Sequence, residues 1–333
     1  MISLINGLRR LRQASRACRT NALRAAIGCA PVRCIPVVML MPSGRRQATP
    51  LNGGASISTV ITNVDVEENI GELLNLVKLA IDKGELDKAE TILEMGIKIC
   101  EEYQSYYAMP YMYDIMASIA LATGKIGKAE NILVRVIEKM VQLGIPEDNS
   151  QMVDFKLRLS RIYSLYQENV LAEIGFGTCL KEQETKINNG DMSMKTSLLY
   201  VNCLFFYGLH KISVSQYKRA KTFIDSAYSY AMKMKGLSPY QEMLILATLA
   251  DLNAQLKDYD IALQYVNSAI ILGKGIGSID LPKLYIKLAK IYANMDSPSM
   301  ARHWLREAAA LANLFNNKKV CDEAEALLQT LSL

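Results

Sequence analysis

Two histidines are the side chains of this chain best suited to acid–base chemistry, because imidazole titrates near neutral pH. His210 ends an apolar stretch, and His303 lies beside Trp304 in an alanine-rich stretch. Neither belongs to a known catalytic pattern, because the sequence contains no Gly-x-Ser-x-Gly, His-Glu-x-x-His or Gly-Lys-Ser/Thr motif. We predict structural or surface roles for both histidines and no enzymatic activity.

A glycine-rich run, Gly273-Lys-Gly275-Ile-Gly277, follows an apolar stretch, as a nucleotide-binding loop would. Its spacing is not that of the dinucleotide fingerprint, and no helix with periodic apolar residues starts directly after it. A flexible turn is the simpler interpretation. We therefore expect no cofactor.

Cysteines supply the remaining chemistry, and their spacing argues against a metal site or a disulfide framework. Three lie among the first 60 residues, and the other four are far apart, without a Cys-x-x-Cys pair. We expect these four to be small buried hydrophobic residues: Cys100, Cys179, Cys203 and Cys321.

A tyrosine cluster, Tyr103, Tyr106, Tyr107, Tyr111 and Tyr113, offers aromatic surface. It could stack against a bound peptide, but aromatic residues more often pack in cores and between repeats. We favour packing, with Tyr113 inside the fold.

The first 60 residues form a separate segment with nine arginines and no lysine, aspartate or glutamate. Because the whole chain carries a net charge of +5, the remainder carries −4. An arginine-rich, acid-free segment is typical of a mitochondrial presequence. A basic tail that binds RNA or lipid is the alternative, although such tails usually mix lysine with arginine. We predict a presequence and flexible linker over 1–60, and a folded domain over 67–333.

Internal repeats organise that domain. A short polar turn is followed by an alanine, a large apolar residue four positions later and, in most copies, a small residue three positions beyond that. The alanines are spaced 40, 43, 48, 42 and 39 residues apart, at Ala89, Ala129, Ala172, Ala220, Ala262 and Ala301.

These alanines indicate helix pairs, because two helices approach closely only where a small side chain lies at their crossing. A partner helix precedes each turn, with its own small residues at Ala117, Ala250 and Ala289. The pattern resembles the tetratricopeptide repeat. We predict an all-α, right-handed solenoid of about six antiparallel helix pairs, with a closing helix over 318–333 that caps the last pair.

A more specific resemblance covers residues 72–333. Its best-matched stretch is Tyr113-Asp114-Ile115-Met116-Ala117, followed by Gly124 and Ala129-Glu130, then Glu147-Asp148-Asn149 and Ile162-Tyr163. These residues, and the order and long spacing of the repeats, resemble the mitochondrial tetratricopeptide repeat protein 19 family.

The resemblance implies a non-catalytic role in assembling or maintaining respiratory complex III, through its Rieske iron–sulfur subunit or processed fragments of that subunit. It also implies association with the mitochondrial inner membrane. That family can carry a membrane span before the repeats. The most apolar early run, 35–41, is far shorter than the roughly 20 residues a span needs, so we expect peripheral attachment or attachment through the complex.

A general mitochondrial import or chaperone adaptor is the alternative function. A nucleic-acid partner is not expected, since the spacing lacks the regularity of base-reading repeats.

In this repeat type the first helix of each pair, helix A, lines the binding groove. Reading the helices A in register predicts nine groove residues, five of them basic: Asn75, Lys78, Asp114, Ser118, Arg158, Arg161, Asp251, Lys287 and Lys290. Such a groove would hold acidic groups or a peptide C-terminus. A solvated charged surface without a ligand is the alternative.

Overall fold

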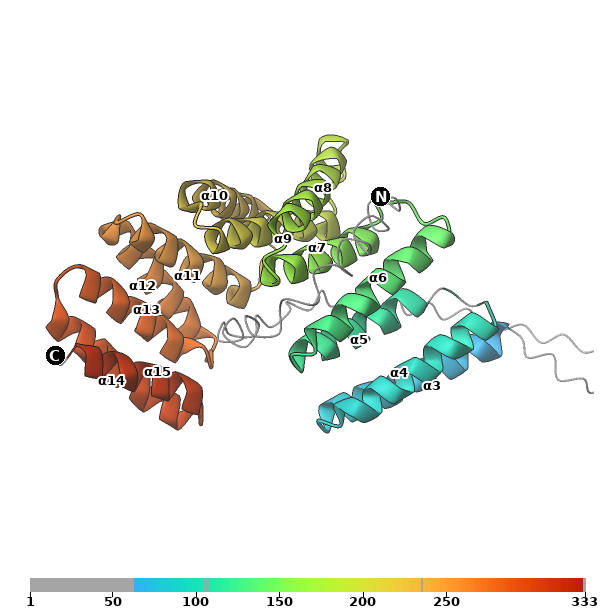
Figure 1. The fold of residues 1–333 in the computed structure, drawn as a ribbon, viewed down its shortest axis with the longest axis horizontal. Helices are drawn as coiled ribbons and strands as arrows, with labels where there is room; N and C mark the ends of the chain where they lie inside the picture. Colours follow the sequence, from blue (N-terminus) through green and yellow to red (C-terminus); the bar gives the residue numbers. More distant parts are fainter. Residues whose placement is uncertain (1–62, 105, 107, 235, 332–333) are drawn as a thin grey trace, which may run out of the picture. The chain divides into compact units, whose positions relative to one another are not determined.

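The computed structural model describes residues 63–331, except 105, 107 and 235. All regular structure in this part of the chain is helical, with thirteen helices and no strand (Figure 1). The helices are α3 (Asn63–Asp82), α4 (Leu86–Glu102), α5 (Met109–Ala122), α6 (Ile126–Gln142), α7 (Ser150–Leu165), α8 (Asn169–Asn188), α9 (Met194–Ser213), α10 (Tyr217–Met234), α11 (Pro239–Gln255), α12 (Tyr259–Gly275), α13 (Leu281–Asn294), α14 (Pro298–Leu314) and α15 (Lys318–Thr330).

Each odd-numbered helix from α3 to α13 packs against the even-numbered helix that follows it, which gives six antiparallel pairs among the described residues. The odd-numbered helices are the helices A, and the even-numbered ones are the helices B. The last helix, α15, packs on α14 and α13 and buries Val320 and Ala324. The predicted all-α fold of paired helices with a closing helix is confirmed.

Buried alanines hold each pair together. The six alanines that begin the helices B have no exposed surface, and neither do Ala117 and Ala250 on helices A. A methyl group at these positions lets the two backbones approach, and a larger side chain would push them apart. The register read from the sequence is therefore correct in every pair.

The turns between helix A and helix B share a backbone feature. The residue two positions before helix B has a positive φ in every pair, for example 77° at Gly84 and 71° at Gly124. Later repeats place an ordinary residue there, with φ of 59° at Ser215 and 67° at Lys257. Glycine adopts this conformation at least cost, yet the turn keeps its form without it.

The chain divides into two compact units at Pro146 and Glu147. In unit 1 the structure describes α3 to α6, and unit 2 contains α7 to α15. Within unit 2, one core lies among α7 to α11 and another among α11 to α15. The apolar helix α9 is buried on most of its surface, with Cys203 at its centre.

The predicted presequence, over 1–60, lies outside the described residues. Among the helices that are described, none combines the length and the apolar character that a membrane crossing requires.

Candidate protein-binding surfaces

The predicted groove residues of unit 1 lie on α3 and α5. Asn75 and Lys78 are exposed on α3. Asp114 and Ser118 lie one turn apart on α5 and are half-buried. The two positions on α3 are therefore the more accessible of the four.

Helix α7 contributes two arginines whose charges already have partners within the fold. Arg158 is 7% exposed, and its guanidinium lies 2.9 Å from the carboxylate of Asp154 one turn earlier. The guanidinium of Arg161 stands over the ring of Phe206 on α9, 3.8 Å from the ring centroid, a favourable cation–π position. Arg158 thus pairs within α7, whereas Arg161 joins α7 to α9 and is the more accessible of the two.

The other predicted residues of unit 2 form ion pairs between successive helices A. Lys287 on α13 pairs with Asp251 on α11. One turn further along α13, the Lys290 ammonium lies 2.9 Å from Glu323 on α15. These pairs are half-exposed, so each contributes about 1 kcal/mol or less to stability. Their lysines remain accessible to a partner that offers carboxylates.

A buried polar cluster connects α7, α8 and α9. The Lys211 ammonium lies 2.6 Å from the Glu173 carboxylate, and this bond lowers the pKa of Glu173. The Nδ1 of His210 lies 2.8 Å from the Ser164 hydroxyl, and its Nε2 is 3.9 Å from Glu173. Burial lowers the pKa of His210. The imidazole side chain has no exposed surface, so a substrate could not reach it. This burial agrees with the structural role predicted for His210.

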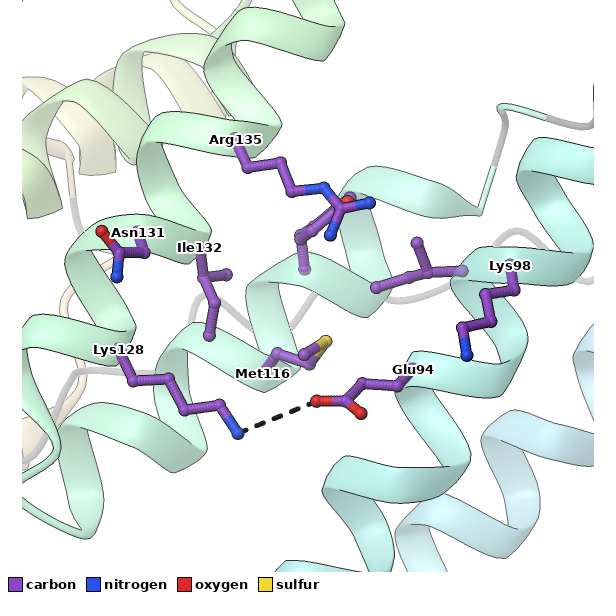
Figure 2. Close-up of a pocket in the computed structure, with 9 residues that line it drawn as sticks. Glu94, Lys98, Met116, Lys128, Asn131, Ile132 and Arg135 are labelled. Carbon is purple, nitrogen blue, oxygen red and sulfur yellow. Dashed lines mark ion pairs between the residues drawn. The ribbon is translucent and has the colours of Figure 1, made fainter.

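A pocket of about 300 Å³ in unit 1 was not predicted from the sequence. It lies among α4, α5 and α6. Figure 2 shows Glu94 and Lys98 on α4 facing Lys128 and Arg135 on α6, with Met116 of α5 between them. Ile97, Ile132 and Tyr113 complete the apolar lining. The predicted groove residues all lie on helices A, whereas all four charged residues of this pocket lie on helices B.

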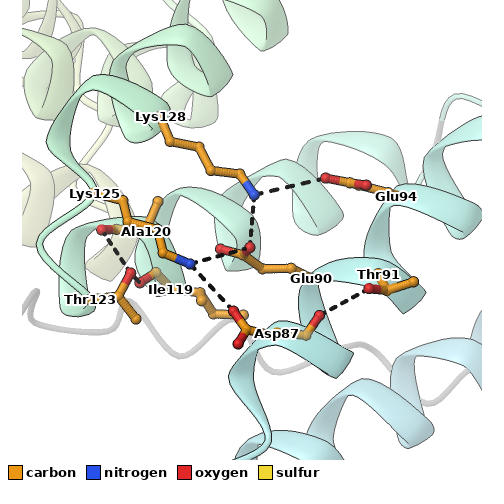
Figure 3. A network of polar contacts seen from close by, with 9 residues as sticks. All are labelled: Asp87, Glu90, Thr91, Glu94, Ile119, Ala120, Thr123, Lys125 and Lys128. Carbon is orange, nitrogen blue, oxygen red and sulfur yellow. Dashed lines mark hydrogen bonds and ion pairs between the residues drawn. The ribbon is translucent and has the colours of Figure 1, made fainter.

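A charge network borders the same pocket where α4 and α6 begin (Figure 3). The Lys128 ammonium lies 2.7 Å from Glu90 and 3.8 Å from Glu94. The Lys125 ammonium lies 3.3 Å from Asp87. The hydrogen bond that the Lys128 ammonium donates to Glu90 is the main cause of the raised pKa of Lys128. The network joins successive helices B and keeps Lys128 in place at the pocket rim.

The tyrosine of the pocket, Tyr113, is 2% exposed, and its hydroxyl is buried without a hydrogen-bond partner. Burial raises its pKa, and the positive charge of Arg135 opposes this effect. The guanidinium carbon of Arg135 lies 5.9 Å from the Tyr113 ring centroid. Tyr113 is thus inside the fold, as predicted, and it also lines the pocket.

The four described cysteines are free and buried, as predicted. Burial raises the pKa of Cys100 to about 11, so this thiol stays protonated and unreactive at neutral pH. No group of three or more His, Cys, Asp or Glu side chains in the described part of the chain could hold a metal ion.

The glycine-rich run differs in part from the prediction. Gly273 and Gly275 belong to the end of α12, and only the residues from Ile276 to Asp280 form the turn to α13. Gly273 is buried in the helix because Met243 and Leu281 pack where a side chain would be. The run is therefore a helix end that packs closely, followed by a short turn.

Comparison with curated proteins finds relatives along most of the chain. Tetratricopeptide repeat protein 19, mitochondrial, of Mus musculus is 25% identical over 260 residues, which cover 75% of this chain and 71% of the mouse protein. The Homo sapiens protein of the same name is 25% identical over 261 residues, which cover 75% and 68% of the two chains. The resemblance expected from the sequence is confirmed.

A homologue in Drosophila melanogaster is 21% identical over 266 residues, covering 80% of this chain and 72% of the fly protein. The relatives are named as mitochondrial proteins, which supports a mitochondrial location. No protein-family model matches the chain.

Solved structures with the same fold include helical-repeat proteins of other functions. One is a Pyrococcus horikoshii signal transduction ATPase with a tetratricopeptide repeat sensor, with a TM-score of 0.56, 18% identity and coverage of 82% of this chain and 44% of that one. Another is the Rap conjugation gene regulator of plasmid pLS20 in complex with the Phr* peptide, with a TM-score of 0.56, 12% identity and coverage of 79% and 80%. These similarities show the fold, a scaffold of tetratricopeptide-type helical repeats.

Proposed function

We propose that this protein is a non-catalytic, protein-binding scaffold that assembles or maintains mitochondrial complex III at the inner membrane. It acts on the Rieske iron–sulfur subunit or its processed fragments. The main support is the similarity to mitochondrial tetratricopeptide repeat protein 19 over three quarters of the chain, together with the role that this family resemblance implies. The arginine-rich, acid-free first 60 residues fit import into mitochondria.

The proposed contact surface is formed by the helices A. In unit 2, the Lys287 and Lys290 side chains lie one turn apart on α13, so they project from the same side of that helix. A partner that offers carboxylates could compete for both lysines, since their present partners are half-exposed. Peptide binding by this fold has a precedent in the Rap regulator solved with the Phr* peptide.

Co-purification tests the proposal. The tagged full chain is expressed in mitochondria, cross-linked gently and purified, and its partners are identified by mass spectrometry. We expect complex III subunits, the Rieske subunit among them. Recovery of translocase or heat-shock proteins in place of complex III would contradict the proposal and favour a general import or chaperone adaptor.

A matched pair of charge reversals tests the surface. Lys287→Glu with Lys290→Glu is expected to abolish recovery of complex III. The control, Lys318→Glu with Lys319→Glu, changes the net charge equally at two exposed lysines of α15. Equal recovery by both variants, with unchanged helical circular dichroism, would place the contact surface elsewhere.

A further inference from the structure

The pocket among α4, α5 and α6 combines an apolar floor with a charged rim. Ile97, Met116 and Ile132 are each at least 93% buried and form the floor. A volume of about 300 Å³ can hold one large side chain, but it is at the low end for a small-molecule site. The size fits a single anchoring residue of a peptide.

Charge around the rim favours an acidic neighbour for that anchor. The lining contains three basic side chains and one carboxylate, Glu94. Lys128 is tied to Glu90 and Glu94, and Arg135 lies 3.3 Å from Glu101. Lys98 is exposed and forms no ion pair with another residue in the described part of the chain. Lys98 is thus the rim cation most available to a carboxylate from outside.

We propose that this pocket binds a partner peptide in which a large apolar side chain is followed by an acidic residue. The apolar side chain occupies the floor, and the carboxylate accepts hydrogen bonds from Lys98. The inference deepens the protein-binding role proposed above, but it does not depend on complex III as the partner. Failure to recover complex III in the co-purification would contradict the proposed function without contradicting the peptide site. Failure of the peptide to bind would contradict the peptide site without contradicting the proposed contact surface on the helices A.

Methyl resonances of the full chain provide the test, because the side chain of Met116 lines the pocket. The protein is labelled at its methionine methyl groups, and the Met116 signal is identified by its loss in Met116→Leu. Three hexapeptides are titrated, which carry Phe-Glu, Phe-Lys or Ala-Glu between Gly-Ser and Ser-Gly. We expect the Phe-Glu peptide to shift the Met116 signal saturably, and the other two to bind at least about tenfold more weakly, which is the loss of one charge-assisted contact or of the apolar anchor.

Two variants locate the contact. Lys98→Glu is expected to weaken the Phe-Glu peptide at least about tenfold, whereas Lys83→Glu, an exposed lysine after α3, is expected to leave its affinity unchanged. Three results would overturn the proposal: a Met116 signal that does not shift with any peptide, equal affinity for the Phe-Glu and Phe-Lys peptides, or equal effects of Lys98→Glu and Lys83→Glu. A Met116 signal that shifts with protein concentration alone would also overturn it, since it would indicate a second copy of this chain in the pocket.

Discussion

The two units use one repeat register to build different surfaces. In unit 1 the residue three positions after Ala129 is Ile132, and it lines the pocket beside Tyr113. In unit 2 the residue three positions after Ala301 is Trp304. Its ring lies 5.2 Å from the ring of Tyr285, the register equivalent of Tyr113. The same register position thus lines an open pocket in unit 1, whereas in unit 2 its larger side chain packs on the tyrosine with the two rings tilted by 49°.

The polar contacts between repeats also differ between the units. In unit 1 they join helices B, through Lys125 and Lys128. In unit 2 several join helices A, such as Lys290 with Glu323, and one group around Lys211 is buried. The apolar crossings repeat, whereas charged contacts vary with each pair of neighbours.

The largest effect is expected where the units are alike, at the helix crossings. Ala129→Arg should lower the free energy of unfolding by about 3 kcal/mol or more, because a long charged side chain would enter a crossing that has no exposed surface. Thermal unfolding followed by circular dichroism measures the change. An unchanged melting curve would show that Ala129 is on the surface and that the register is shifted.

Exchanging the side chains of Ile132 and Trp304, which distinguish the two units, should change the free energy of unfolding by unequal amounts. Trp304→Ile should cost about 2–3 kcal/mol, because it removes ring contacts and leaves a cavity. Ile132→Trp should change stability by less than about 1.5 kcal/mol, since space for the ring already exists, and it should block the Phe-Glu peptide. Urea unfolding measures both variants. A similar cost for the two exchanges would mean that the pocket does not accept the larger ring.

Two glycines of α8 test how closely helices pack in unit 2. A methyl group at Gly175 would overlap the Ser160 hydroxyl on α7, whereas one at Gly177 would have nothing within 4 Å. Gly175→Ala should therefore cost about 1–2 kcal/mol, and Gly177→Ala should stabilise by about 0.5–1 kcal/mol through helix propensity. Urea unfolding of both variants compares the two positions on one helix. Stabilisation by both alanines would contradict the close approach of α7 and α8.

The smallest effect concerns pH and the buried cluster around His210. Because the pKa of His210 is lowered in the folded state, the unfolded chain binds its proton first as the pH falls below about 6.5. Folding stability should then decrease with falling pH, from that value down to the folded pKa. The slope should not exceed about 1.4 kcal/mol per pH unit, the limit for one proton.

Urea unfolding between pH 7.5 and 5.5 measures this slope. His210→Phe should flatten it, whereas His303→Gln, at the exposed second histidine, should not. The residues that face His210 are Ser164, Glu173, Phe176 and Tyr207. Of these, Glu173 titrates below this range because the pKa of its carboxyl is lowered. An equal slope in the wild type and His210→Phe would assign the pH dependence to other groups.

Residue spacing was enough to predict the helix pairs. The alanine positions and the closing helix follow from contacts within one turn of a helix or within one pair. Such contacts repeat with the helical period, so a single chain displays them as a pattern. The positions of the turns are also predicted by this spacing, even where Ser215 replaces glycine, because the apolar patterns of the two flanking helices end on either side of the turn.

The partner of each charged residue depended on the tertiary structure. Arg158 was predicted to face a groove, but it is buried beside Asp154. Lys290 meets a carboxylate 33 residues later, and Lys128 meets one 38 residues earlier. Such pairs depend on the angle and offset at which neighbouring helices pack, and long flexible side chains reach several alternatives at nearly equal free energy. The pocket depends on the same geometry, because it is the volume that three helices leave unfilled, and no period in the sequence records it.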